Sequence, residues 1–385
     1  MAQTSAPATD HAPALRSRDI ASHPVPTGRE EEWRFTPLAP IADLLSGQAP
    51  LNGGADVDAE TDPGARVEFV GTDDARVGRT FLPTDIASAR ALAAAPQALI
   101  VTLPREWQGV ARVAVRGRGE DVAGHVVIEA EPFSEGTVLV DFSGSGRYVG
   151  ALEIRVGDGA RLTVVSLQDW STGGVHLGEH HASLGRDSRL LMGHITLGGQ
   201  IVRIAPKVSY QAPGGDAELL GLFFADAGQH LEHRVFIDHD TPHCRSSVLY
   251  KGALQGDGSH TVWIGDVLVR SQAVGVDTYE VNRNLILTDG ARADSVPNLE
   301  LETGEIVGAG HASATGRFDD EQLFYLQSRG IPADLARVLV VRGFFADVLH
   351  RIGQPELTQR VMRTVDGRLG VVALDGEAGD EELAE

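Results

Sequence analysis

One histidine, His311, stands in a segment of small residues, GAGHASATG (308–316). Because none of its neighbours in this segment is bulky, another backbone or a second subunit can approach the imidazole closely. A neutral imidazole can bind a transition metal and exchange a proton near neutral pH. The same composition is typical of a loop whose histidine faces solvent, so the segment by itself leaves both interpretations open.

A second group of possible ligands lies in the segment HLEHRVFIDHDTPHC (230–244) and comprises His230, His233, His239, His243 and Cys244. If the segment is a strand, His230 and His233 point to opposite faces, because side chains alternate along a strand. His239 and His243 flank a proline turn and could converge. Structural histidines are therefore the favoured interpretation, and the metal site of a hydrolase is the alternative.

Other chemistries find no support in the sequence. The glycine-rich stretch GSGRYVG (144–150) is followed by another strand-like run, ALEIRV, whereas a dinucleotide-binding loop must lead into a helix. No stretch fits the phosphate-binding pattern G-x-x-x-x-G-K-[ST] or the hydrolase elbow G-x-S-x-G.

Charge and hydropathy exclude further classes. The formal net charge is −21, with 33 Lys and Arg against 54 Asp and Glu, so nucleic acid is a poor partner. Cys244 is the single cysteine, which excludes a disulfide framework or a thiolate metal cage within one chain. The N-terminal segment lacks the apolar core of a secretory signal, and no apolar run reaches transmembrane length. We therefore expect a cytoplasmic protein.

The elements that must position these residues are strands. From residue 98, short apolar runs such as ALIVTL, HVVIEA and RLTVVSL recur between Gly and Asp turns, without helices between them. Three runs place a small residue, Ala160, Ser188 or Ala217, before a charged residue and a leucine, at spacings of 28 and 29 residues. A near-constant period predicts a solenoid such as a β-helix. A β-sandwich with regular hairpins is the alternative.

Changes in composition divide the chain into five parts. We predict a disordered lead-in over 1–25, a mixed, partly helical region over 26–97, a β-helix core over 98–316, a helical region over 317–373 and an acidic tail over 374–385. Asp319 is suited to cap the first C-terminal helix, Gly330 to end it, and Pro332 to begin the next.

Long stretches of the chain resemble a known family. The segment 311–352 (HASATGRFDDEQLFYLQSRGIPADLARVLVVRGFFADVLHRI) resembles the C-terminal signature shared by the SufB and SufD proteins of iron–sulfur cluster assembly. Segments 230–269 and 272–316 continue the resemblance, and 26–38 is a weaker echo of it. Within this family the chain resembles the SufD type, because it has a single cysteine and because Ala312 follows His311. Ala309 stands where many relatives have a cysteine.

The resemblance implies a mainly β fold, a right-handed parallel β-helix flanked by N-terminal and C-terminal helical segments. It implies a heterodimer with SufB through the β-helix and a C-terminal helical dock for the ATPase SufC. It also implies that an iron–sulfur cluster is built transiently at the SufB–SufD interface, where His311 matches the histidine assigned to SufD, with no cofactor or metal in the isolated chain. Within the dock we expect Phe324, Tyr325 and Arg329 to contact SufC, because aromatic and Arg side chains commonly anchor interfaces.

Three functions remain distinguishable at this point. The first is a non-catalytic scaffold subunit of the cluster assembly machine, which could form a homodimer when isolated. The second is a metal-dependent enzyme that uses the cluster from His230 to Cys244. The third is a structural adaptor that recruits SufC, for which His311 would be dispensable.

Overall fold

The structure is a computed structural model that describes residues 15–51, 53–318 and 320–370. The chain forms two compact units, Met1–Gly316 and Arg317–Glu385, which are described separately. The first unit contains the strands and the N-terminal helices, and the second contains three helices.

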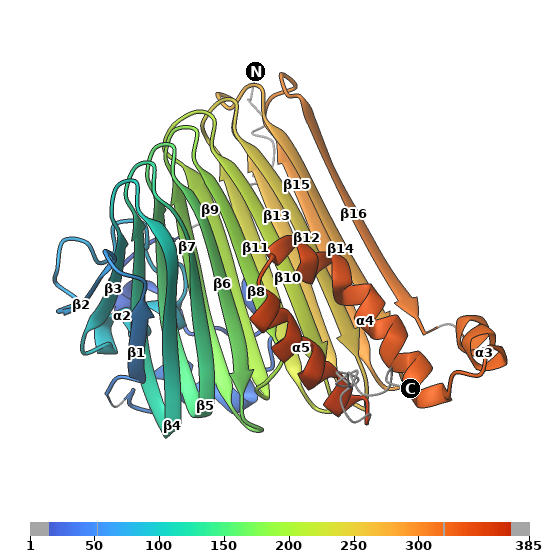
Figure 1. Cartoon of the computed structure of the whole chain (residues 1–385). Helices are drawn as coiled ribbons and strands as arrows, with labels where there is room; N and C mark the ends of the chain where they lie inside the picture. Colours follow the sequence, from blue (N-terminus) through green and yellow to red (C-terminus); the bar gives the residue numbers. More distant parts are fainter. Residues whose placement is uncertain (1–14, 52, 319, 371–385) are drawn as a thin grey trace, which may run out of the picture. The chain divides into compact units, whose positions relative to one another are not determined.

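The first unit is a parallel β-solenoid in which each coil contributes one strand to each of two rows (Figure 1). One row runs through β5 (Glu135–Val156), β6 (Arg161–Trp170), β8 (Arg189–Thr196), β10 (Asp216–Ala225), β12 (Arg245–Leu254), β14 (Asp277–Ile286) and β16 (Gly308–Arg317). The other runs from β5 through β7 (Val175–Leu184), β9 (Ile201–Tyr210), β11 (His230–His239), β13 (His260–Val269) and β15 (Arg292–Leu301). Neighbouring strands within these rows are parallel, so the predicted β-helix is confirmed and the β-sandwich is wrong.

The predicted repeat is correct in period but not in register. Arg161 pairs with Arg189, as a spacing of 28 residues requires, but Arg189 pairs with Asp216, which is 27 residues further on. Ala217 therefore aligns with Leu190 rather than with Ser188. Later coils are longer, for example from Arg245 to Asp277. The turns between strands differ in length and account for these differences in coil length. The repeated sequence pattern therefore indicates successive coils but does not determine which residues align.

Two long strands begin the solenoid and bend around its corner. β3 (Ala98–Leu103) pairs with the second half of β4 (Gln108–Ala130), and β4 pairs with β5 along most of its length. The first half of β5 pairs with β6 and its second half with β7. Gly144 lies between the halves at φ 94°, where a Cβ atom would come within 2.2 Å of the Gly117 carbonyl oxygen. The glycine-rich stretch at 144–150 thus serves a strand corner.

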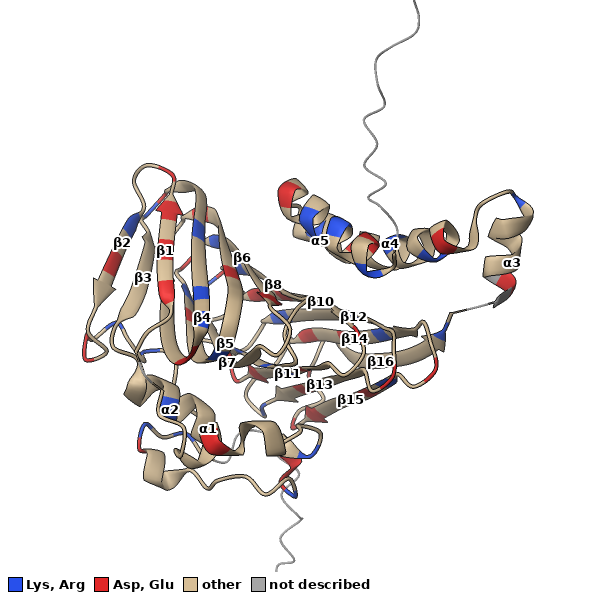
Figure 2. Ribbon diagram, turned by 90° about the horizontal axis from the view of Figure 1, so that it is seen from below, with Lys and Arg blue, Asp and Glu red and all other residues tan. Residues whose placement is uncertain are grey.

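The helical segments of the N-terminal region pack on the outer face of the second row, whereas its two strands pair with β4 and β3 and extend the sheet. The region contains α1 (Ala42–Ser46), β1 (Asp56–Thr61), β2 (Arg66–Val70) and α2 (Ile86–Ala94), with Asp85 as the N-cap of α2. Trp33, Leu44 and Leu45 form a buried cluster with outward side chains of the sheet, on the side where Figure 2 shows α1 and α2. Within the segment 1–25, which was predicted as a lead-in, Arg18 donates hydrogen bonds to the carbonyl oxygens of Val77 and Gly78; residues 1–14 lie outside the described residues.

The second unit consists of α3 (Asp320–Ser328), α4 (Ala333–Ile352) and α5 (Pro355–Arg368). The buried side of α4 is formed by Ala336, Val338, Val341, Phe345, Val348, Leu349 and Ile352. The Arg342 guanidinium donates to both carboxylate oxygens of Asp366, at 2.8 Å from Nε, and this pair ties α4 to α5. Figure 2 shows basic and acidic residues mixed along both helices. Pro332 is the N-cap of α4 rather than its first residue, and Asp319 and the acidic tail lie outside the described residues.

Candidate functional site

His311 lies on β16, the strand that ends the first row of the solenoid. Its side chain is 44 % exposed, and its Nδ1 atom lies 3.8 Å from Oε1 of Glu280 on β14. The Asn284 amide donates to the Thr315 hydroxyl across a separation of 31 residues. The same separation relates Glu280 to His311, so the two side chains occupy matching inward positions of successive coils.

The inward positions that align with His311 on the preceding coils of the first row change from apolar to polar along the solenoid. Met192 pairs with Leu219, Leu219 with Val248, and Val248 with Glu280. The first three side chains are buried in the apolar interior. These positions therefore continue as a hydrophobic stack through three coils and end in a carboxyl group and an imidazole.

Other inward positions of the last coils are polar as well. β14 directs Thr278, Glu280, Asn282 and Asn284 inward and buries them all. Thr278 shares a hydrogen bond of 2.6 Å with Ser246, and the Asn284 amide donates to Asn282 at 2.7 Å. On the terminal strands the Ser313 hydroxyl donates to Ser295 at 2.8 Å. The first row of the solenoid thus ends in polar inward side chains, whereas Ala293 and Leu299 of β15 still pack against the apolar core.

Glu280 differs from these neighbours because its carboxyl group has no hydrogen-bond partner. Its side chain is 1 % exposed, and both carboxyl oxygens are buried and unpartnered. Burial, and secondarily the negative charge of Asp266, raise the pKa of Glu280 from 4.5 to about 9. Sequence reasoning missed this residue. The available signal was an acidic residue at an inward position of an alternating strand, DTYEVNRN.

The second group of candidate ligands, from His230 to Cys244, does not converge. His230 lies on the outer face beside Glu232, at 3.0 Å, whereas His233 lies inside beside Thr196, at 3.1 Å. The predicted separation of these two histidines is confirmed.

The remaining members of this group also have separate partners. His239 bonds Ser246 at 2.9 Å, His243 occupies a turn at φ 58°, and the buried Cys244 thiol faces the carbonyl oxygens of Ala212 and Pro242. Among the residues that the structure describes, no group of three or more His, Cys, Asp or Glu side chains could hold a metal ion. The geometry therefore gives no support to a metal-dependent enzyme at this segment.

An imidazole pair on the outer face was not expected from the sequence. His230 Nδ1 lies 3.1 Å from His260 Nδ1, and His260 Nε2 lies 2.7 Å from Asp294. With Glu232 at the other end, four side chains form a continuous hydrogen-bonded row. His230 and His260 pair in register on β11 and β13. The sequence could have indicated this pair, because the two histidines are separated by about the length of one coil.

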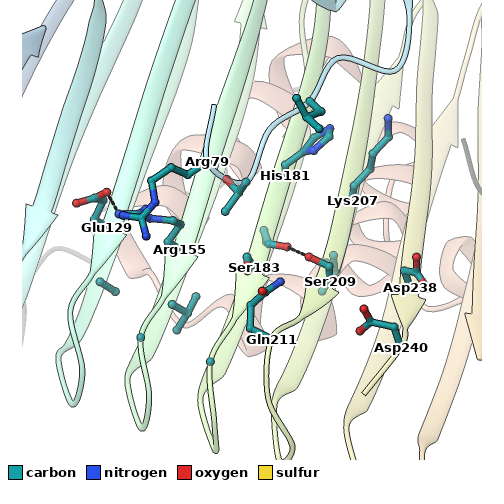
Figure 3. Close-up of a pocket in the computed structure, with 18 of the residues that line it drawn as sticks. Arg79, Glu129, Arg155, His181, Ser183, Lys207, Ser209, Gln211, Asp238 and Asp240 are labelled. Carbon is teal, nitrogen blue, oxygen red and sulfur yellow. Dashed lines mark hydrogen bonds and ion pairs between the residues drawn. The ribbon is translucent and has the colours of Figure 1, made fainter. Parts of the chain in front are cut away.

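A polar pocket of about 630 Å³ lies over the strands of the second row (Figure 3). Arg155 pairs with Glu129, and Arg79 lies close by in Figure 3. Lys207 lies 3.0 Å from the Glu179 carboxylate, and Asp238 accepts from Arg270. Since these charges largely compensate one another, the pocket offers a mixed polar surface rather than a site for one sign of charge.

The expected docking residues lie on and after α3. Phe324 and Tyr325 are 71 % and 57 % exposed. The Arg329 guanidinium lies 5.2 Å from the centre of the Tyr325 ring, which holds the ring outward. The structure thus leaves both aromatic rings of α3 exposed.

No helix in the described part of the chain has the length and apolar character needed to cross a membrane.

Comparison with known proteins agrees with the architecture. Residues 113–344 match the family model described as "SUF system FeS cluster assembly, SufBD core domain". The chain is 50 % identical over 365 residues to an iron-sulfur cluster assembly SufBD family protein of Mycobacterium tuberculosis, covering 92 % of each chain. It is 25 % identical over 240 residues to the iron-sulfur cluster assembly protein SufD of Escherichia coli, covering 61 % of this chain and 56 % of that protein. The corresponding values for SufD of Bacillus subtilis are 24 % over 253 residues, 64 % and 57 %.

The family model covers more than half of the chain, and the mycobacterial relative covers nearly all of it. The parallel solenoid and the polar end of its first row lie largely within the matched residues. The chain therefore belongs to the SufBD family of the SUF iron–sulfur cluster assembly system.

Proposed function

We propose that the chain is a non-catalytic scaffold subunit that pairs with SufB, docks the ATPase SufC and presents His311 as an iron ligand where the cluster is built. The observation that carries the proposal is the position of His311. It is a half-exposed imidazole on the terminal strand of the first row, where the inward positions have become polar. An imidazole nitrogen is a good ligand for iron.

The proposal requires a partner, because one imidazole and one carboxyl group cannot complete the coordination of a cluster. Iron–sulfur clusters are usually held by four protein ligands, most of them thiolates. The only thiol of this chain, Cys244, is buried away from His311 on a different coil. The missing ligands would come from SufB, and the cluster is the cargo of the complex rather than a resident cofactor of this subunit.

The test is cluster formation in the complete SufB–SufC–SufD-type complex at matched yield. His311→Ala is expected to lower iron and acid-labile sulfide severalfold without loss of the complex, because an exposed side chain contributes little to folding. Ser313→Ala is the matched control, since Ser313 lies two residues further along the same strand. Equal loss in both variants, or in Cys244→Ala, would contradict the role of His311.

The terminal strand is also the surface proposed for pairing with SufB. β16 is hydrogen-bonded to β14 and ends the strand order, so it leaves one edge available for another strand. In the isolated chain the same edge would support a homodimer. Ala309→Pro removes one backbone donor from β16 and should weaken both associations. Unchanged dimerisation of the isolated variant would place the contact elsewhere.

The second unit is proposed to bind SufC through Phe324, Tyr325 and Arg329. The support is the exposure of both aromatic rings and the stacking of Arg329 on Tyr325. Buried aromatic and Arg side chains contribute a large share of binding energy at protein interfaces. The proposed location of the complex is the cytoplasm.

A further inference from the structure

The unpartnered carboxyl group of Glu280 requires an explanation. Buried polar groups in folded proteins almost always have hydrogen-bond partners, and an orphaned group often points to a functional role. The other inward polar side chains of β14, Thr278, Asn282 and Asn284, each have at least one partner. Glu280 has none on either oxygen.

The surroundings of Glu280 hold the carboxyl group in place. Gly265 on β13 leaves a hollow for it, because a Cβ atom at Gly265 would lie 2.3 Å from Oε2 of Glu280 and 2.4 Å from the Trp263 ring. Trp263 is fully buried, which closes the hollow on that side. Asp266, the nearest acidic neighbour, is itself bonded to the Asn298 amide at 2.7 Å. The carboxyl group of Glu280 is therefore enclosed on these sides by β13.

On the side toward β16, the carboxyl group of Glu280 faces His311. Oε1 of Glu280 lies 3.8 Å from Nδ1 of His311, which is longer than a hydrogen bond. The buried carboxyl group is held, whereas the half-exposed imidazole has room to turn. A movement of the His311 side chain that shortened this distance would place Nδ1 in hydrogen-bonding contact with Glu280 and leave Nε2 available for another partner.

We propose that Glu280 is a positioning residue that accepts the Nδ1–H of His311 and thereby leaves Nε2 free to bind the iron cargo. The inference rests on the proposed function for the identity of the cargo, but not for the hydrogen bond itself. A carboxyl group keeps an acceptor lone pair whether or not it carries a proton. Histidines that bind metals usually donate their second ring N–H to a carboxylate or carbonyl, which fixes the tautomer and the ring orientation.

The direct test is the protonation of the His311 ring in the full-length isolated chain. Samples labelled with ¹⁵N-histidine are compared at about pH 8 by long-range ¹H–¹⁵N correlation, with the signal assigned from His311→Ala. We expect hydrogen on Nδ1 in the wild type and in Glu280→Gln, whose amide oxygen also accepts. In Glu280→Met, which keeps the length but loses the acceptor, hydrogen should move to Nε2, the form that imidazole favours in water.

The outcomes separate positioning from a merely structural role. Wild-type protein with hydrogen only on Nε2 would overturn the proposal, and so would an unchanged ring in a folded Glu280→Met variant. Unchanged signals from the other histidines establish that this variant is folded. A change in both Glu280→Met and Glu280→Gln would also overturn it, because the amide should rescue.

A second measurement links the hydrogen bond to assembly. Loss of a partner of a metal-binding histidine lowers metal affinity by about 10- to 100-fold, so Glu280→Met in the complete complex should slow cluster formation at least severalfold, with rescue by Glu280→Gln. If the ring protonation responds as expected but His311→Ala forms clusters normally, the proposed function fails while the positioning contact stands. Normal cluster formation in Glu280→Met together with a defect in His311→Ala would overturn the positioning role alone.

Discussion

Replacing Glu280 by methionine should stabilise the first unit, although Glu280 is proposed to be useful. Methionine has a similar unbranched shape and fits the hollow beside Gly265 without leaving a polar group buried. A pKa raised from 4.5 to about 9 means that the carboxyl group is neutral in the folded chain, whereas it ionises in the unfolded chain. The contribution of Glu280 to the stability of the wild type therefore falls as the pH rises from 4.5 towards 9.

The magnitude follows from the same shift. Each pH unit between the two pKa values lowers the free energy of unfolding by about 1.4 kcal/mol. Relative to the wild type, the Glu280→Met variant should therefore gain about 1 kcal/mol at pH 5 and about 5 kcal/mol at pH 8 from the missing ionisation.

The assay is urea unfolding followed by tryptophan fluorescence at both pH values. All four tryptophans belong to the first unit, so the signal reports on the solenoid and its N-terminal cover. Glu280→Gln is the control: it should lose the extra pH dependence but keep the cost of a buried polar group. If the wild type and Glu280→Met had the same pH dependence, the carboxyl group of Glu280 would be ionised in the folded chain, which would contradict the raised pKa.

Three further predictions concern the buried histidines, the glycine beside Glu280 and the proposed SufC-binding surface. Burial lowers the pKa values of His180, His233 and His239 to about 3, so these rings stay neutral in the folded chain. Their contribution to the free energy of unfolding should therefore fall as the pH drops below about 6.5, by up to about 4 kcal/mol per pH unit for the three together. Circular dichroism melts at pH 7 and pH 5 test this, and equal stability at both would contradict it. Gly265→Ala should destabilise the first unit by about 1–3 kcal/mol in urea unfolding because its Cβ atom meets Glu280 and Trp263, and a neutral result would show that this space is not filled. Phe324→Ser should reduce SufC co-elution at least tenfold with little change in melting temperature, whereas wild-type co-elution would place the dock elsewhere.

The sequence predicted the solenoid because its physical basis is local. Short apolar strands and frequent turns recur at a nearly fixed period, and stacked coils bury such strands one after another. The register could not be predicted in the same way. Asp216 aligns with Arg189 because the intervening turns have a particular length, and the similar patterns at Ser188 and Ala217 concealed a slip of two residues.

The candidate site was predictable only in part for a related reason. His311 was recognisable from its small neighbours and from the family signature. Glu280 lies 31 positions earlier and acquires its meaning only when the coils are stacked, since its partnerless burial depends on Gly265 from the opposite strand row. Likewise, Leu339 fits a helical apolar pattern but is exposed on α4, because the packing of three helices and not periodicity alone decides which side is covered.

The proposed role of His311 is to bind iron of the nascent cluster through its imidazole. The most direct measurement is pulsed electron paramagnetic resonance of the reduced cluster in a complex in which only this subunit carries ¹⁵N-labelled histidine. We expect a ¹⁵N hyperfine coupling from a bound imidazole, present in the wild type and absent in His311→Ala. A cluster without that coupling in the wild type, or the same coupling after His311→Ala, would contradict it.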